Sequence, residues 1–152
     1  MMAELNIAAA VPEIWLACAA MVLLILGVFR GDRFTRPLAW LAAVALVIGA
    51  YLAVHAAPTT GATPAFGGLF ILDGFAGFMK ALSLVATAVA ILMSLGYAER
   101  CGMARFELPI LMLIAALGMS MMISANNLIS LYVGMELQSL ALYVVAAFNR
   151  DT

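Results

Sequence analysis

Long runs of apolar residues alternate with short polar segments along the whole chain. Five of these runs approach or exceed the roughly 20 residues that an α-helix needs to cross a hydrocarbon layer of about 30 Å. The pattern predicts transmembrane helices at about residues 12–29, 37–57, 73–97, 108–124 and 127–148. The expected fold class is therefore all-α, with residues 1–152 forming a single transmembrane region of a polytopic membrane protein.

Polar residues mark where several of these helices begin. Pro12 suits a first helical turn, and Asp73 and the pair Asn126–Asn127 suit the N-cap position. Residues 58–72 are rich in Gly, Pro and Thr and then become apolar (FGGLFIL). We therefore expect this segment to lie at the interface on the outer, non-cytoplasmic side of the membrane.

The N-terminal segment MMAELNIAAAVPEIW carries two acidic residues, Glu4 and Glu13, and no basic residue. A cleavable secretory signal needs a positively charged start. We therefore expect the first apolar segment to be retained in the protein.

Composition supports the membrane interpretation. The chain is 67% hydrophobic and only 10% charged, with a mean hydropathy of +1.16, whereas soluble domains are about 25% charged. Too little polar surface remains to cover a soluble core.

The net charge of −1 and the absence of a basic patch argue against a nucleic-acid partner. No CxxC pair, His/Cys cluster, phosphate loop or Ser/His/Asp set occurs, so we expect no metal, cofactor or redox chemistry in this chain.

The basic residues predict the orientation in the membrane. The connections at residues 1–11, 58–72 and 125–126 contain no Lys or Arg. The other connections and the C-terminal segment hold all six arginines: Arg30, Arg33, Arg36, Arg100, Arg105 and Arg150. Because basic residues accumulate on the cytoplasmic side, the N-terminus is expected outside and the C-terminus in the cytoplasm, which an odd number of spans also requires.

Glu136 lies about nine residues into the fifth predicted span, close to the bilayer midplane. A charged side chain there costs about 2.5–3.5 kcal/mol on insertion scales. Helical spacing places Tyr132, Glu136, Ser139 and Tyr143 on one face. A carboxylate on this polar stripe could hold or pass a proton, because a neighbouring charge can switch its protonation. The alternative is that Glu136 only bonds a neighbouring helix.

Apart from Asp73 at its first position, Lys80 is the only charged residue within the third predicted span. One hypothesis places it on a proton route, with Ser83 and Thr87 extending a polar line inward from it. The other hypothesis is an anchored lysine that snorkels to the outer interface, with Asp73 seven residues earlier as its partner on the same face.

Two stretches of the chain resemble a known family. Residues 124–151, SANNLISLYVGMELQSLALYVVAAFNRD, are similar to the fourth-to-fifth-helix region of subunit N of bacterial NADH-quinone oxidoreductase (respiratory complex I). Residues 68–86, GLFILDGFAGFMKALSLVA, resemble its third-helix region. The wider antiporter-like family shares a helix with a central glutamate, and the ELQSLALY motif points to subunit N.

The resemblance implies a proton-pumping subunit in the membrane arm, located in the bacterial inner membrane beside other membrane-arm subunits, including antiporter-like ones. Glu136 would match the family glutamate that pairs with a lysine on a later, broken helix and couples distant redox chemistry to proton transfer. NADH, FMN, iron–sulphur clusters and quinone would belong to other parts of the complex, and this subunit would bind none of the redox cofactors.

The chain also departs from the family pattern. Family members are several times longer and contain two inverted five-helix repeats, each with a broken helix. This chain would hold three leading helices and the first two helices of the first repeat, without the lysine partner of Glu136. It would therefore be the N-terminal portion of such a subunit. Alternatives are a subunit of a multisubunit cation/proton antiporter, which would share Glu136, or a purely structural membrane subunit.

Overall fold

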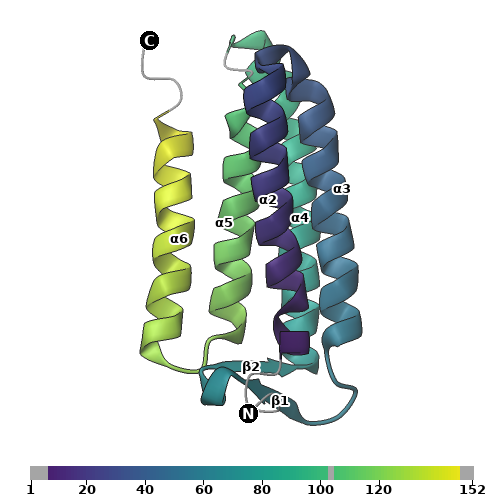
Figure 1. The fold of residues 1–152 in the computed structure, drawn as a ribbon, viewed down its shortest axis with the longest axis vertical. Coiled ribbons are helices and arrows are strands. Elements are labelled where there is room, and N and C mark those ends of the chain that lie inside the picture. The colour runs from purple at the N-terminus through teal and green to yellow at the C-terminus, as the bar shows by residue number, and fades with distance from the viewer. Residues whose placement is uncertain (1–6, 103–104, 148–152) are drawn as a thin grey trace.

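Five long helices make up most of the chain in the computed structural model, which describes residues 7–102 and 105–147 (Figure 1). They are α2 (Val11–Arg30), α3 (Thr35–Ala56), α4 (Gly74–Arg100), α5 (Glu107–Ser124) and α6 (Leu128–Ala146). Each is long and apolar enough to cross a membrane. The prediction of an all-α, polytopic membrane protein is thereby confirmed.

The helix bounds follow the apolar runs closely. The largest difference is at the end of α4, which continues to Arg100 rather than ending near Tyr97. The expected end of the fifth span at residue 148 lies outside the described residues, and α6 itself ends at Ala146. Two of the expected N-caps are confirmed: Asp73 accepts a hydrogen bond from the Ala76 amide (2.7 Å), and Asn127 accepts one from the Ser130 amide (2.8 Å).

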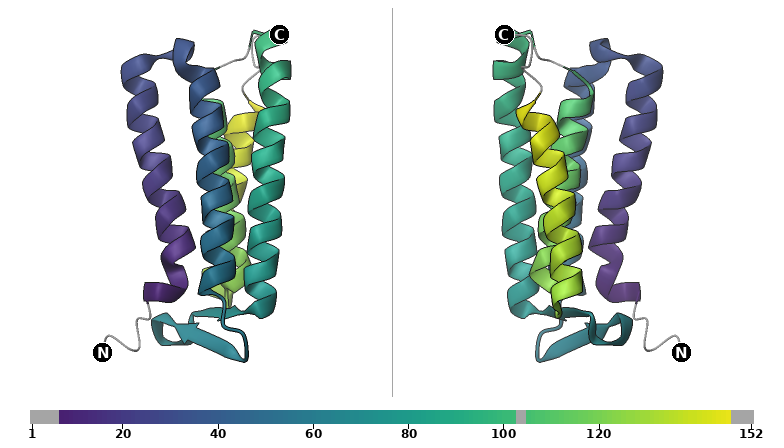
Figure 2. Two further views of the ribbon diagram at one scale, coloured as in Figure 1. Left: turned by 90° about the vertical axis from the view of Figure 1, so that its right-hand side faces the viewer. Right: turned by 90° about the vertical axis from the view of Figure 1, so that its left-hand side faces the viewer.

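The helices run alternately up and down, and α2, α3, α4 and α5 form a bundle around a core of small side chains (Figures 1 and 2). Lipid is as apolar as leucine, so close packing of small residues holds membrane helices together. The buried face of α3 follows this rule and consists largely of alanine, with Ala39, Ala42, Ala43 and Ala53 all buried.

Helix α6 stands beside α5 at one side of the bundle (Figure 1). The two helices approach most closely at Gly118 of α5 and Gly134 of α6. A Cβ atom added to Gly118 would lie 2.7 Å from the Gln138 amide nitrogen and 2.8 Å from the Gly134 carbonyl oxygen. Only the absence of a side chain permits this backbone approach.

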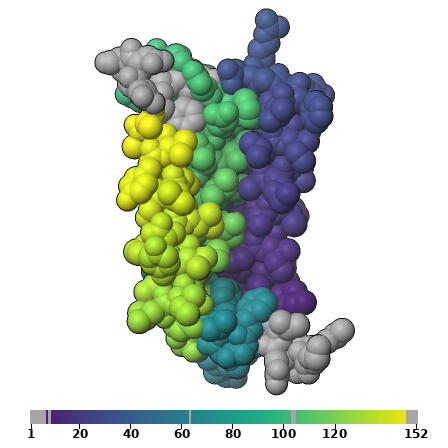
Figure 3. All heavy atoms as spheres, turned by 60° about the vertical axis from the view of Figure 1, so that its left-hand side comes forward, coloured from purple at the N-terminus to yellow at the C-terminus, as the bar shows by residue number. Residues whose placement is uncertain are grey.

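The rest of α6 is largely uncovered. Gly134 and Ala141 are its only buried residues, and large apolar side chains such as Leu128 and Ile129 are exposed. Figure 3 shows α6 as a separate column beside α5, on the opposite side from α2.

A β-hairpin closes one end of the bundle. Strands β1 (Ala62–Ala65) and β2 (Phe70–Asp73) pair antiparallel, with Ala65 opposite Phe70. The Asn126 side chain donates a hydrogen bond to the Gly68 carbonyl (2.7 Å), and the Asn126 amide donates one to the Leu69 carbonyl (3.1 Å). The turn between α5 and α6 therefore clamps the hairpin in place.

The glycine contact between α5 and α6 gives a test of how the last helix is held. In detergent, Gly118→Ala should lower the free energy of unfolding by about 1–3 kcal/mol, because the added methyl group meets backbone atoms that cannot swing aside. Gly96→Ala is the matched control, since Gly96 has open space around its Cβ position. We expect it to leave stability unchanged or raise it slightly. Equal effects of the two substitutions would contradict this packing.

Candidate functional site

Lys80 is completely buried (0% exposed) inside the bundle, near the hairpin end. Its Nζ lies 2.5 Å from Oε1 of Glu13, which is itself 8% exposed. The same Nζ lies 4.6 Å from the centroid of the Phe70 ring. The buried ammonium group is therefore stabilised by a carboxylate and by a cation–π contact.

Local structure explains why these two groups meet. Glu13 is in the first turn of α2, which begins at Val11 with Pro12 next to it. Lys80 is six residues past the start of α4, or about 9 Å along the helix axis. Helical side chains lean toward the N-terminus, and α2 and α4 both begin at the hairpin end (Figure 1). The long lysine side chain therefore reaches back to the level of Glu13.

The hypothesis of a snorkelling lysine paired with Asp73 is wrong. Lys80 reaches no exposed surface, and Asp73 is engaged as the N-cap of α4. The physical reason is that strand β2 and the start of α2 cover the direction in which the lysine would snorkel, and α2 brings a carboxylate with it.

Much of the hydrogen-bonding capacity around this pair is unused. Apart from their contact with each other, neither the Glu13 oxygens nor the Lys80 nitrogen has a hydrogen-bond partner within the described part of the chain. The hydroxyl groups of Ser120 and Ser124, on successive turns of α5, are also buried without a hydrogen-bond partner there. Ser124 precedes Ala125, which forms an isolated bridge with Phe70, so these hydroxyls belong to the same end of the bundle.

A cavity of about 320 Å³ lies beside Glu13, between the start of α2, the hairpin, α5 and α6. We call it the hairpin cavity. Glu13 and Ser130 are the polar side chains in its wall. The remaining lining is apolar and comprises Ala10, Phe66, Leu69, Phe70, Met121, Ile129 and Val133.

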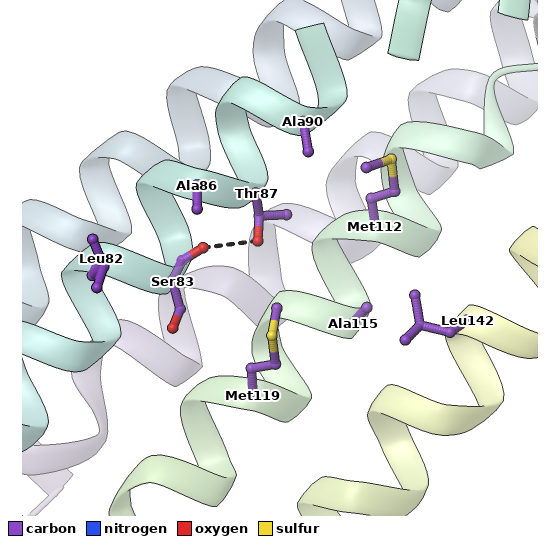
Figure 4. Close-up of a pocket in the computed structure, with 9 residues that line it drawn as sticks. All are labelled: Leu82, Ser83, Ala86, Thr87, Ala90, Met112, Ala115, Met119 and Leu142. Atoms are coloured by element: carbon purple, nitrogen blue, oxygen red, sulfur yellow. Dashed lines mark hydrogen bonds between the residues drawn. The ribbon is translucent and has the colours of Figure 1, made fainter. Parts of the chain in front are cut away.

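A second groove, of about 450 Å³, runs between α4, α5 and α6 (Figure 4). Ser83 and Thr87 line it from α4, and the Thr87 hydroxyl donates a hydrogen bond to the Ser83 carbonyl (2.8 Å). Met112, Ala115 and Met119 of α5 and Leu142 of α6 form much of the rest of its wall. Ser83 and Thr87 follow Lys80 by three and seven residues, so the polar line predicted along α4 leads into this groove.

Glu136 is half-buried, eight residues or about 12 Å from the start of α6. Ser139 is half-buried as well, whereas Tyr132 (57%) and Tyr143 (69%) are exposed. The predicted polar stripe therefore faces the side of α6 that the bundle leaves open. Among the residues described, none forms an ion pair or hydrogen bond with the Glu136 side chain.

The predicted candidates thus fall into two groups. Lys80 belongs to a buried ion pair at the core, and Glu136 with Tyr132, Ser139 and Tyr143 lies on the open face of α6.

Sequence reasoning missed Glu13, which was considered only as evidence against a signal peptide. A signal was available: besides the expected N-cap Asp73, Glu13 and Glu136 are the carboxylates that fall within the predicted spans. In residues 7–102 and 105–147 no group of His, Cys, Asp and Glu side chains is arranged to hold a metal ion.

The buried pair leads to a stability prediction. Lys80→Gln or Glu13→Gln alone should lower the free energy of unfolding by about 3–5 kcal/mol, because each leaves an uncompensated buried charge. The double substitution should recover most of that loss. The exposed pair Arg36–Glu99 (3.7 Å) is the matched control, and Arg36→Gln should cost less than about 1 kcal/mol. Additive single effects in a double-mutant cycle at Glu13 and Lys80 would contradict the pairing.

Comparison with known proteins gives close relatives but no matching protein-family model. The chain is 54% identical to NADH-quinone oxidoreductase subunit N of Parvibaculum lavamentivorans over 93% of its residues. It is 51% identical to the protein of the same name from Paramagnetospirillum magneticum over 99% of its residues, and 51% identical to that of Rhodobacter capsulatus over 93%. The chain spans only 29% to 31% of the length of these relatives. The resemblance inferred from the sequence is therefore confirmed: the chain is similar, along nearly its whole length, to a part of NADH-quinone oxidoreductase subunit N.

Proposed function

We propose that this chain is part of a proton-translocating subunit in the membrane arm of an NADH-quinone oxidoreductase, in the inner membrane of a bacterium. The relatives' name supports the assignment to that complex. The observation that carries the proton-handling role is Glu136, a carboxylate deep in a membrane-spanning helix on a face that the rest of the chain leaves open. Such residues mark ion and proton routes.

In this proposal Glu136 binds and releases the translocated proton. A carboxylate in the hydrocarbon region needs a partner or water to remain charged. Since none of the described residues pairs with it, we infer that a cationic group from another part of the assembled subunit approaches the open face of α6. When that cation is near, the carboxylate is favoured, and when it withdraws, the protonated acid is favoured.

The neighbours of Glu136 on the stripe fit a relay. The hydroxyl groups of Tyr132, Ser139 and Tyr143 can both donate and accept hydrogen bonds, and they lie on the same face of α6 at helical spacing. The exposed apolar side chains around them would pack against other membrane-arm segments or against lipid. Electron transfer from NADH to quinone would take place in other subunits.

The central test replaces Glu136 in the full-length subunit within the assembled complex. Glu136→Gln should lower NADH-driven proton translocation about tenfold or more, because an amide cannot carry the proton. Glu136→Asp should retain part of the activity. Glu99→Gln, at an exposed carboxylate near the end of α4, is the matched control and should pump normally. If Glu136→Gln assembles and both pumps protons and reduces quinone at the full rate, the proposal fails.

The orientation can be tested through Cys101, an exposed free thiol at the end of α4 beside the arginine-rich connection. A membrane-impermeant maleimide should label Cys101 rapidly in inverted vesicles and leave it unlabelled in intact spheroplasts. Thr59→Cys, placed at the hairpin end in a Cys101→Ser background, should show the opposite pattern. Labelling of both positions from the same side would rule out the predicted topology.

A further inference from the structure

Glu13 faces two environments at once. On one side its carboxylate meets the buried ammonium group of Lys80, and on the other it lines the hairpin cavity. Besides Lys80, no described residue donates a hydrogen bond to either carboxylate oxygen, although Glu13 is only 8% exposed. A polar group that is buried in this way and borders a cavity is where water binds inside a protein.

We propose that Glu13 and Lys80 form a second protonation site, separate from Glu136, which exchanges protons with the hairpin end of the bundle through the hairpin cavity. The ligand is a proton, delivered or removed by water. This inference rests on the proposed proton-translocating function, to which it adds a site and an access route.

The exchange can be written with its atoms balanced. A proton leaves the Lys80 ammonium nitrogen and binds a Glu13 oxygen, so that one N–H bond breaks, one O–H bond forms and the pair becomes a neutral amine and a carboxylic acid. The acid then releases that proton to a water molecule in the hairpin cavity, which becomes hydronium and leaves at the hairpin end. The reverse transfer, from hydronium in the hairpin cavity to Glu13 and from the acid to the Lys80 nitrogen, restores the ion pair, so the site takes up and releases protons through this one cavity.

The surroundings of the pair contain few other groups that could take over this role. On β2, Asp73 is engaged with the Ala76 amide. His55, at the hairpin end of α3, is exposed and lies against Tyr51, with 4.2 Å between the ring centroids. Apart from the pair, the charged residues of α2, α4 and α5 lie at the opposite end of those helices, and these are Arg30, Glu99, Arg100 and Glu107.

Helix α6 connects this site with the proposed pumping glutamate. Ser130 and Val133 form the α6 wall of the hairpin cavity. Glu136 follows Val133 by three residues, so it lies one helical turn further along that wall. A change of charge at Glu13 would therefore change the electrostatic potential at the Glu136 carboxylate, because the apolar region between them screens electrostatic interactions only weakly.

A purely structural ion pair would be arranged differently. Buried pairs that only stabilise a fold need well-aligned hydrogen bonds to offset the cost of desolvation. Here no other described residue hydrogen-bonds to either member of the pair, and the carboxylate borders a cavity. This arrangement favours proton exchange over static cross-linking.

The first experiment measures access to Glu13 in the assembled complex with the full-length subunit. A carbodiimide couples to protonated carboxyl groups, and the modified Glu13 peptide is quantified by mass spectrometry. Lys80→Gln removes the counter-charge and should raise labelling of Glu13 about fivefold or more. Ser130→Phe fills the hairpin cavity and should lower labelling about fivefold. Leu131→Phe places the same aromatic side chain one residue further along α6, at a position outside the cavity wall and 43% exposed, and it should leave labelling unchanged.

The second experiment measures protons translocated per NADH oxidised. The double variant Glu13→Gln/Lys80→Gln keeps a hydrogen-bonding pair without ionisable groups, so it should assemble but translocate at least twofold fewer protons. Labelling of Glu13 that ignores Ser130→Phe, or full translocation by the assembled double variant, would overturn this inference. Normal pumping by Glu136→Gln, run in parallel, would instead overturn the proposed function, so the two failures can be told apart.

Discussion

The burial of the Lys80 ammonium group is the constraint around which the hairpin end of this structure is organised. A charged group in the interior of a membrane bundle requires a counter-charge at short range. Glu13 of α2 supplies the charge and the Phe70 ring of β2 supplies a polarisable surface. One side chain of α4 thereby links the first helix, the hairpin and the start of its own helix. Because Phe70 also bridges to Ala125, the link extends to the turn before α6.

Away from this polar end, the bundle is held by close contact between small residues. Alanines fill the faces between α3 and its neighbours, and glycines let α5 and α6 touch backbone to backbone. These contacts are specific without being polar, which suits a solvent as apolar as the side chains themselves. The outcome is a packed set of four helices, with α6 attached to α5 along a single seam. Its remaining faces, including the stripe around Glu136, are left free to meet other parts of a larger assembly.

The two acidic sites, Glu13 and Glu136, therefore differ in whether their partner lies within this part of the structure. Glu13 is paired within the chain and can be reached from the hairpin cavity, whereas Glu136 has its open side toward whatever covers α6. Both lie in the half of the bundle nearer the hairpin or at its middle, and α6 forms a wall for one and carries the other. This geometry is compatible with proton movement in which the state of one site influences the next.

Much of the architecture was determined by the sequence itself. Five apolar runs of membrane-spanning length predicted five helices, and Asp73 and Asn127 marked two helix starts, because span length and N-cap chemistry are local properties. The position of Glu136 within its helix and the spacing of its polar stripe were local as well. The partner of Lys80 could not be determined from local sequence. Asp73 lay nearby on the same predicted helix face, whereas Glu13 is 67 residues away in sequence, and only the packing of α2 against the start of α4 and the covering hairpin decides between them. The exposure of the polar stripe was likewise a tertiary result, since it depends on which face of α6 the glycine contact with α5 occupies.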